Sequence, residues 1–591
     1  MASLYKNILS LLNFNQKIKI IIVFILTILV SLLETVGIGF LAYFISLIAD
    51  VENVLEKAPI KYFNFFFVNK DTNSIIGTFL FILILFFVLK NILIFLFHFF
   101  TNKIKFSIEF NLVTKLISKY LSKNYNFFII NDKSKIINYI KEETKRANMV
   151  IFGLVNLIKE VILIAILTSS ILLMNLNNSL LVILPMFVMS FLIYRFLKNT
   201  LIKVGKLQTT SLNQLFKNIY EIMDGIKLLK LRRLENKFFL KIKSSYKDYF
   251  KVMFISSYIV PIPRLLLEVL GVGGLCSIIF FYISSGYDFS DILPTITFMA
   301  LAIIRLVPSI SALNSSFNTI TNHKISIENI CNEIKNKNFL ENKLNDNKNN
   351  PLKNKINNLK IKDLSFNYLG SNQKALNKIN LEFKKNEIIG VLGKSGSGKS
   401  TLMDILSGLL KFSDGEIIIN NDNENEYENF TSGIGYVPQN NFIFDTSLAD
   451  NVALESNDKE IDHQKVAHAI NVTGLDKEIS NDRLLGTSGE KISGGQKQRI
   501  GVSRVYYQNP SLLIFDEATS SIDIEAERKI MENIYSQKNE KIILIVAHRL
   551  STLNICDKLL ILENGKVKDF DTKKNILERH QYLRDYIEPK D

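Results

Sequence analysis

Six stretches of this chain are apolar over about the length needed to cross a lipid bilayer. A membrane-spanning helix takes about 20 consecutive apolar residues, and in lipid every peptide group must find its hydrogen bond within the segment. The sequence therefore predicts a helical membrane domain with six transmembrane helices over residues 1–335. The six stretches lie near residues 18–49, 75–100, 149–174, 178–200, 255–285 and 292–315.

Two long loops between these stretches, about 101–148 and 201–254, are charged and helical in pattern. Both are rich in Lys and Arg, as in "KLLKLRRLENK" from Lys227. Because basic loops stay on the cytoplasmic side, we predict that both loops and both termini are cytoplasmic. These loops also account for the net charge of +15, so we predict no nucleic-acid partner.

The composition changes after the last apolar stretch. Residues 336–358 are polar and rich in Asn and Lys, which predicts a linker. In residues 359–591, short β-branched runs alternate with helical patterns, so we predict a soluble α/β domain. The first apolar run lacks the features of a cleaved signal peptide, and three distant cysteines predict buried thiols rather than disulfides or a metal site. The cysteines are Cys276, Cys331 and Cys556.

A predicted strand in the second domain runs directly into a glycine-rich loop and then a helical pattern, as "IIGVLGKSGSGKST" from Ile388. Backbone N–H groups of such a loop, with the N-terminus of the helix, bind phosphates. We expect Lys399 to reach the β- and γ-phosphates of ATP and the Ser400 hydroxyl to bind Mg²⁺. The residues expected to bind ATP here are Gly393, Lys394, Ser395, Gly396, Ser397, Gly398, Lys399, Ser400 and Thr401.

Two acids end another apolar strand, "SLLIFDE" from Ser511. Asp516 is placed to hold Mg²⁺ through water, and Glu517 to polarise the water that attacks the γ-phosphate. The simpler alternative is a pair of carboxylates that caps the next helix, and the phosphate-binding loop makes the catalytic interpretation the better one.

A second anion-binding helix start is predicted in "KISGGQKQR" from Lys491. One domain already has its own phosphate loop, so a second site of this kind is best explained if it serves the nucleotide of a partner. The sequence therefore predicts a homodimer with two ATP molecules between the subunits. The residues expected to contact the partner's nucleotide are Ser493, Gly494, Gly495 and Gln496.

With these motifs in this order, the chain resembles an ATP-binding cassette exporter of the half-transporter, type IV class. "ISGGQ" resembles the signature of that family, with Ile492 where Leu is usual. The resemblance implies six transmembrane helices fused to an α/β P-loop ATPase domain, with ATP and Mg²⁺ as cofactors. It also implies an adenine-stacking aromatic, a Mg²⁺-sensing glutamine, an aspartate that couples the two sites and a histidine that contacts the γ-phosphate. These are Tyr368, Gln439, Asp523 and His548.

Communication between the two domains is also implied by the resemblance. Short coupling helices at the tips of the long loops are expected near 124–133 and 223–233. Exporters of this family often carry an acid in the loop before the signature, where this chain has Thr487. Glu490 lies nearby and is a candidate replacement for that acid.

Charged residues within the apolar stretches are costly and normally face an internal cavity or a partner charge. Arg264 and Glu268 are four apart and could form an ion pair along one helix face. Lys90 and Arg305 have no acid within a helical turn, which favours an anionic ligand in the cavity. The alternatives are a long-range pair with Glu34 or an arginine that reaches a lipid headgroup.

Three stretches, "SLLETVGIGFLAYFISLIAD", "PIPRLLLEVLGVGG" and "ALAIIRLVPSISAL", resemble PglK-type flippases, which move lipid-linked oligosaccharides for protein glycosylation. That resemblance implies that Lys90, Arg264 and Arg305 contact the diphosphate of a polyprenyl diphosphate glycan, with Lys90 where that group has arginine. It also implies a multi-pass protein of the bacterial inner membrane that contacts membrane lipids.

An aromatic outer loop, "IKYFNFFFV" from Ile60, is either a plug packed on its neighbours or a helix that touches the lipid tail. The alternative functions are export of another lipid, a peptide or a drug, and an anchored ATPase that regulates a partner without transport.

Overall fold

The structure is a computed structural model that describes most of the 591 residues, and these fall into two compact units. One unit comprises Met1–Leu121 with Lys133–Lys337, and the other Ser122–Asp132 with Asn338–Asp591. The predicted aromatic outer loop, His548 and almost all of the predicted linker lie outside the described residues. The described residues are 2–49, 72–131, 133–174, 176–259, 261–284, 289–335, 356–368, 370–371, 373–420, 433–454, 461–519, 521–546, 553–581 and 583.

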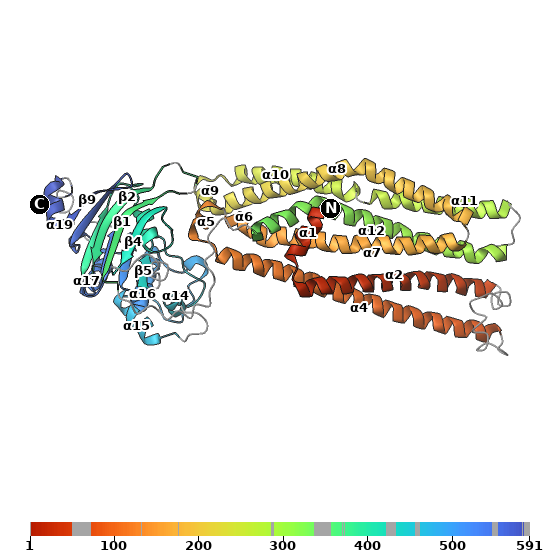
Figure 1. The fold of residues 1–591 in the computed structure, drawn as a ribbon, viewed down its shortest axis with the longest axis horizontal. Coiled ribbons are helices and arrows are strands. Elements are labelled where there is room, and N and C mark those ends of the chain that lie inside the picture. Colours follow the sequence, from red (N-terminus) through yellow and green to blue (C-terminus); the bar gives the residue numbers. More distant parts are fainter. Residues whose placement is uncertain are drawn as a thin grey trace. The chain divides into compact units, whose positions relative to one another are not determined.

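The first unit is entirely helical in its described residues (Figure 1). Its longest helices contain about 50 residues and would extend ~75 Å, well beyond the ~30 Å hydrocarbon core of a bilayer. The elements are α1 (Ala2–Leu11), α2 (Phe14–Ala49), α4 (Thr72–Leu121), α6 (Lys133–Asn138), a π-helical turn (Tyr139–Glu143), α7 (Thr144–Met174), α8 (Leu176–Asp224), α9 (Ile226–Arg232), α10 (Glu235–Ile259), α11 (Ile262–Ser284) and α12 (Phe289–Lys335).

Five helical segments among the described residues are long and apolar enough to span a membrane. The remaining predicted stretch, near 178–200, lies within α8. The stretch predicted over 255–285 is divided, because α10 ends at Ile259 and α11 begins at Ile262. Prolines at 261 and 263 explain the division, since proline cannot donate the backbone hydrogen bond that a continuous helix needs. The five spans are Phe14–Ile48, Thr72–Leu121, Lys135–Leu172, Glu235–Ser284 and Ile296–Lys335.

The helical unit is held together by an apolar core between α7 and α12, to which α2 and α11 contribute. Leu163 and Leu167 of α7 are fully buried, as are Ala302 of α12 and Leu267 of α11. By contrast, α4 leaves side chains such as Phe81 and Phe95 exposed, as expected for a surface that faces lipid. Cys276 of α11 is also exposed, so the prediction of a buried thiol was wrong there and is confirmed for Cys331 and Cys556.

The second unit contains two sheets and a short helix, α5 (Tyr125–Ile130), from the first long loop. A three-stranded antiparallel sheet has the order β2-β1-β4, and a six-stranded sheet has the order β5-β6-β7-β3-β8-β9. The first five strands of the larger sheet are parallel, and β9 is antiparallel to β8. The strands are β1 (Asn358–Phe366), β2 (Leu376–Lys384), β3 (Glu387–Leu392), β4 (Asp414–Ile419), β5 (Ile434–Val437), β6 (Leu512–Asp516), β7 (Ile542–Val546), β8 (Lys558–Glu563) and β9 (Lys566–Thr572).

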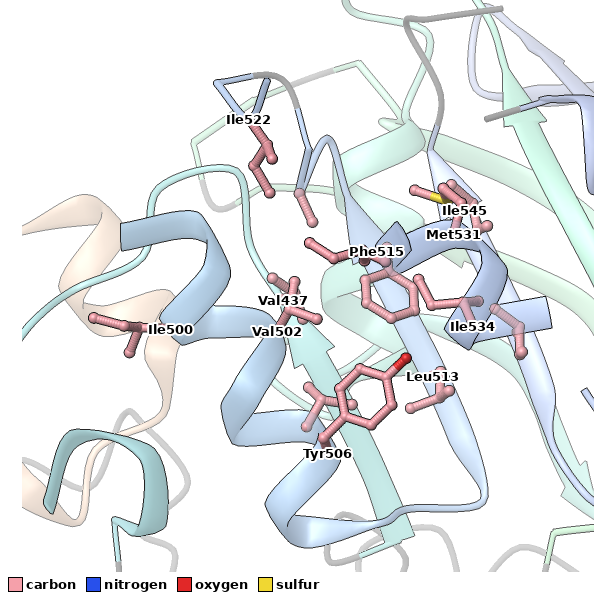
Figure 2. Packing of buried hydrophobic residues seen from close by; sticks show 14 of the residues in the cluster. Val437, Ile500, Val502, Tyr506, Leu513, Phe515, Ile522, Met531, Ile534 and Ile545 are labelled. Carbon is pink, nitrogen blue, oxygen red and sulfur yellow. The ribbon is translucent and has the colours of Figure 1, made fainter. Parts of the chain in front are cut away.

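Both faces of β6 and β7, in the middle of the six-stranded sheet, are buried, which agrees with their continuous apolar sequences. Neighbouring residues Ile388 and Ile389 of β3 enter two different apolar clusters. On one face, Phe515 of β6 packs with residues of α16 and α17 (Figure 2). The helices of this unit are α13 (Lys399–Leu406), α14 (Leu448–Ala453), α15 (His463–Val472), a 3₁₀ turn (Thr487–Gly489), α16 (Gly494–Gln508), α17 (Ile524–Ser536) and α19 (Lys573–Arg579).

The sheet register brings the predicted phosphate loop and the predicted acids to one edge. β7 lies between β3 and β6, and its residue Val546 pairs with Val391 on one side and Asp516 on the other. The loop after β3 and the acids at the end of β6 therefore emerge from the carboxyl ends of parallel strands, where α/β sheets bind ligands.

Candidate functional site

The loop after β3 has the backbone of a phosphate-binding cradle. Gly398 has a φ of 100°, and a Cβ atom placed there would lie 2.8 Å from the Ala375 carbonyl oxygen. Only glycine fits this position, so the backbone can turn tightly into α13. The hydroxyl of Ser397 is buried with no hydrogen-bond partner among the described residues, and a phosphate oxygen would provide one. The loop therefore fits a bound nucleotide.

Lys399 folds back over this loop. Its Nζ donates to the carbonyl oxygens of Gly393, at 2.7 Å, and of Lys394, at 3.1 Å. Burial lowers the pKa of Lys399, and the carboxylates of Glu517 and Asp516 oppose that shift. The ammonium group thus lies between the loop and the acids, where phosphates would be neutralised.

The residues predicted to bind Mg²⁺ come together in part. The Ser400 hydroxyl hydrogen-bonds the carboxylate of Asp516, which is buried at the end of β6. Burial raises the pKa of Asp516, and the hydrogen bond from Ser400 partly offsets this. A hydroxyl and a carboxylate side by side are the oxygen ligands that Mg²⁺ prefers, so this pair fits the metal.

The third predicted ligand, Gln439, contacts the predicted catalytic acid instead. Its Nε2 donates to Oε2 of Glu517 at 2.7 Å. Glu517 itself has a φ of 51°, an uncommon conformation for a residue with a side chain. The strand-end turn thus places this carboxylate beside Asp516 and within reach of the loop after β5.

The predicted adenine-stacking residue is anchored to the same helix as the phosphate loop. The hydroxyl of Tyr368 is 3.0 Å from the hydroxyl of Thr401 in α13, and its ring packs edge-on against Phe366 at 5.0 Å. The tyrosine ring therefore lies next to the phosphate loop. Its contact with adenine stays a prediction.

The predicted signature forms the N-terminus of α16. Ser493 and Gln496 make reciprocal hydrogen bonds that cap this helix, and Gly495 has no room for a side chain because a Cβ atom placed there would lie 2.9 Å from the Ser521 carbonyl oxygen. Asp523 caps α17 by accepting from the Ala526 N–H at 2.9 Å. Within the described part of this unit, no hydrogen bond joins the signature to the phosphate loop.

Thr487, which replaces the usual acid, has an acidic neighbour that the sequence pattern did not indicate. Its hydroxyl is 3.4 Å from Oδ2 of Asp445, a residue of the segment that follows Gln439. The sequence pointed to Glu490 as the replacement for that acid. The carboxylate that contacts Thr487 belongs to Asp445, which lies 42 residues away along the chain.

Arg305 is already paired with an acid, which would compete with an anionic ligand. Its Nε donates to Oε2 of Glu34 at 3.0 Å, and Nη2 donates to the same oxygen, so α12 is tied to α2. The long-range ion pair was the alternative that the sequence left open, and the structure contains it. The anionic ligand expected at Arg305 stays a prediction. The pairing was hidden because 271 positions separate the two residues along the chain.

Lys90 of α4 completes a cluster with this pair. It interacts electrostatically with both Glu34 and Arg305, and its Nζ lies 4.1 Å from the centre of the Phe87 ring. It also approaches α2 at Gly37, one turn beyond Glu34. Two cations and one acid give the cluster a net charge of +1.

Arg264 is exposed on α11, and no ion pair joins it to Glu268 in the described part of the chain. The ion pair that the sequence left open as an alternative for Arg264 is therefore absent there. An exposed guanidinium on a membrane helix needs an anion, a headgroup or a second subunit.

The sequence interpretation overlooked a charged pair within the third apolar stretch. Lys159 Nζ lies 3.6 Å from Oε1 of Glu160, and both side chains are largely buried. The other oxygen of Glu160 has no hydrogen-bond partner among the described residues. The signal was visible as two adjacent charges in "NLIKEVILIAIL".

Short helices occur at both positions expected for coupling helices. α5 lies within 124–133 and groups with the unit that contains the sheets. α9 lies within 223–233 and groups with the helical unit. Leu231 of α9 is 78% exposed, and Lys230 and Arg232 make its last turn basic.

Comparisons with known proteins agree with this architecture. Residues 376–520 match the ABC transporter family. A bacterial Atm1-family ABC exporter with ATP bound has the same fold, with a TM-score of 0.75 over 98% of this chain and all of that chain, at 18% identity. The chain therefore has the ABC exporter fold, as predicted: a helical membrane domain with several spans followed by a nucleotide-binding domain.

Similar proteins differ in what their names say they move. The alpha-hemolysin translocation ATP-binding protein HlyB of Proteus vulgaris is 35% identical over 236 residues, which is 39% of this chain and 33% of the relative. An ATP-dependent lipid A-core flippase of Vibrio parahaemolyticus is 33% identical over 214 residues, 35% of this chain and 37% of the relative. The match thus spans only about a third of each relative's length.

Proposed function

We propose that this chain is one half of a homodimeric, ATP-driven flippase of the bacterial inner membrane, with its nucleotide-binding domain and both termini in the cytoplasm. The cargo is an anionic lipid-linked oligosaccharide, a polyprenyl diphosphate glycan. The observation that carries the ATPase part is the convergence of Lys399, Ser400, Asp516 and Glu517 at one edge of the sheet.

Phosphoryl transfer needs positioning and charge neutralisation more than covalent chemistry. The glycine-rich loop and Lys399 would hold the phosphates, and Ser400 and Asp516 would hold Mg²⁺, which would supply charge neutralisation on the phosphates. Glu517 orients the attacking water. Gln439, which contacts Glu517 in this structure, connects the acid with the segment that leads to Asp445 and Thr487.

Two features support the dimer, because each would contact a second chain: the start of α16 and the end of α9. The signature at the start of α16 presents backbone N–H groups of Gly494 and Gly495, but one chain supplies no phosphate loop to it by hydrogen bonding in its described residues. α9 ends in exposed Leu231 with basic neighbours. A second copy, facing the first, would use both features.

The anionic cargo is supported by the balance of charge in the membrane helices. The cluster of Lys90, Arg305 and Glu34 has a net charge of +1, and Arg264 is exposed. A diphosphate is a fitting partner, because Arg offers it a planar pair of donors and Lys a compact charge. In this proposal, Arg305 contacts the diphosphate and also stays paired with Glu34.

Protein or peptide export is a second candidate, because the similar proteins include hemolysin translocation proteins. The same fold is also compatible with export of another lipid or a drug, and with regulation of a partner without transport.

The test is a fluorescence flipping assay on the full chain in liposomes, with a labelled polyprenyl diphosphate glycan, a labelled phospholipid and a labelled peptide in parallel. We expect ATP-dependent movement of the diphosphate glycan alone, and Glu517→Gln should abolish both hydrolysis and movement. Arg264→Leu should slow movement of the glycan and leave ATP hydrolysis unchanged, whereas Lys243→Leu, an exposed cation of α10, should change neither.

Each other outcome points to a different function. ATP-dependent movement of the peptide or the phospholipid would replace the proposed cargo. Hydrolysis without movement of any of the three would favour the regulatory ATPase. Undiminished glycan movement in Arg264→Leu would remove that arginine from the cargo path.

A further inference from the structure

A tyrosine and a second carboxylate lie behind Asp516, and nothing in the motifs accounts for them. Tyr436 belongs to β5, which pairs in parallel with β6. Its hydroxyl lies 3.5 Å from Oδ2 of Asp516 and 3.3 Å from Oδ1 of Asp404, in α13. One hydroxyl thus connects the strand before Gln439, the acid at the end of β6 and the helix that follows the phosphate loop.

The chemistry of this group is unusual for a protein interior. A phenol has a single proton to donate, and here two carboxylates compete for it. Among the described residues no cation forms an ion pair with Asp404, and Tyr436 is its side-chain hydrogen-bond partner. A half-buried carboxylate without an ion-pair partner is often found at a functional site.

The position of the tyrosine suggests what it orients. Asp516 accepts a hydrogen bond from Ser400 on the phosphate-loop side, and on the β5 side it shares the single proton of the Tyr436 hydroxyl with Asp404. A carboxylate held from two sides cannot rotate freely about its Cβ–Cγ bond. Residues that hydrogen-bond a metal-binding carboxylate commonly set its affinity for the metal.

We propose that Tyr436, held by Asp404, is a positioning residue that fixes the Asp516 carboxylate for the divalent metal of the ATP site. The inference rests on the proposed ATPase function, which assigns Asp516 to Mg²⁺. Tyr436 contacts Asp516 and acts through that carboxylate. Asp404 acts one step further back, by keeping the tyrosine hydroxyl in place.

Metal affinity is the readout that separates positioning from simple structural support. We would titrate Mn²⁺ into the full-length protein with bound ATP and follow free Mn²⁺ by electron paramagnetic resonance. Tyr436→Phe should raise the dissociation constant for Mn²⁺ about tenfold, because it removes the hydroxyl and keeps the ring. The matched control is Tyr506→Phe, which removes a buried hydroxyl with no hydrogen-bond partner among the described residues and should leave the constant unchanged.

Asp404 gives a second, independent comparison. Asp404→Asn keeps an acceptor oxygen for the tyrosine and should bind Mn²⁺ nearly as the unmodified protein does. Asp404→Leu removes it and should weaken metal binding, but only in a chain that still has Tyr436. In a chain that already carries Tyr436→Phe, Asp404→Leu should not lower the affinity for Mn²⁺ any further. This comparison also detects a variant that simply unfolds, because unfolding would lower the affinity in either background.

Equal Mn²⁺ affinity in Tyr436→Phe and Tyr506→Phe would overturn the inference. So would additive effects of Asp404→Leu and Tyr436→Phe. If the unmodified protein binds Mn²⁺ and ATP but does not hydrolyse the ATP, the proposed ATPase function fails while the positioning role of Tyr436 stands.

Discussion

At the scale of single residues, burial places several carboxyl groups of the nucleotide site in an unfavourable environment. Asp404 is the clearest example, because burial raises its pKa to about 6, and the neighbouring Asp516 carboxylate adds to the shift. The hydrogen bond from Tyr436 opposes the increase but does not cancel it. The folded chain therefore holds this acid at a cost whenever it is ionised.

This cost predicts a pH-dependent gain in stability from Asp404→Asn. The pKa is higher in the folded than in the unfolded state, so the carboxyl favours folding only when it is protonated, and that contribution disappears as the pH rises from about 4 to about 6. At pH 8 the asparagine variant should be more stable by about 1 kcal/mol, after discounting for partial solvent screening.

Thermal unfolding at pH 4.5 and pH 8 measures the effect. The variant should show a higher midpoint than the unmodified protein at pH 8, and a smaller difference at pH 4.5. An equal gain at both pH values would mean that the charge of Asp404 is not the cause.

At the scale of helices and strands, the sequence predicted the features that depend only on residues close together along the chain. The apolar stretches, the strand before the phosphate loop and the two short helices at the loop tips lie where expected. The division between α10 and α11 at Pro261 was within reach of the sequence, because two prolines close together at 261 and 263 remove backbone donors there. A single interior proline, Pro185, does not divide α8. The lengths of α4 and α8 follow from the helical pattern of the charged loops.

Contacts between elements could not be read from the sequence. Glu34 and Arg305, Asp445 and Thr487, and Tyr436 and Asp404 each lie on different elements, and helix or sheet packing decides that they meet. No periodicity records which face of one helix meets which face of another. This is why the sequence favoured an anionic ligand for Arg305 and left the pair with Glu34, which the structure contains, only as an alternative.

The ion pair between α2 and α12 predicts an asymmetric mutational response. In Glu34→Ala the arginine loses its acid partner in a segment of low polarity, and its side chain is just 34% exposed. We expect a loss of about 2 kcal/mol, lower than for a fully buried pair because the guanidinium is only partly enclosed by protein. Glu34→Ala combined with Arg305→Ala should be more stable than Glu34→Ala alone, since only one cation of the cluster, Lys90, then remains without an acid instead of two.

Thermal unfolding of the protein in lipid nanodiscs would measure both variants. Lys241→Ala, which breaks an exposed ion pair with Glu221, is the control and should change the midpoint little. Additive losses in the double variant would show that Glu34 and Arg305 do not stabilise each other.

At the scale of the whole molecule, the proposed dimer assigns each ATP to the phosphate loop of one chain and the signature of the other. Gly494 is the most informative signature position, because a Cβ there would lie 3.8 Å from Ser521, an ordinary contact, so a side chain can be added without a clash. Gly494→Asp should therefore preserve the fold and place a negative charge against the phosphates. Lys399→Ala removes the cation of the phosphate loop.

These two changes give opposite results depending on how the chains are combined. If each site is shared, a dimer of one unmodified chain and one doubly changed chain has no intact site. The doubly changed chain lacks a working phosphate loop for its own ATP, and it presents a defective signature to the ATP on its partner's loop. A dimer of one Lys399→Ala chain and one Gly494→Asp chain keeps one complete site and should hydrolyse ATP. If each chain contained its own complete site, the first dimer would be the active one and the second would be inactive. Purification of the two mixed dimers through different tags on each chain, followed by measurement of ATP hydrolysis, decides between the two arrangements.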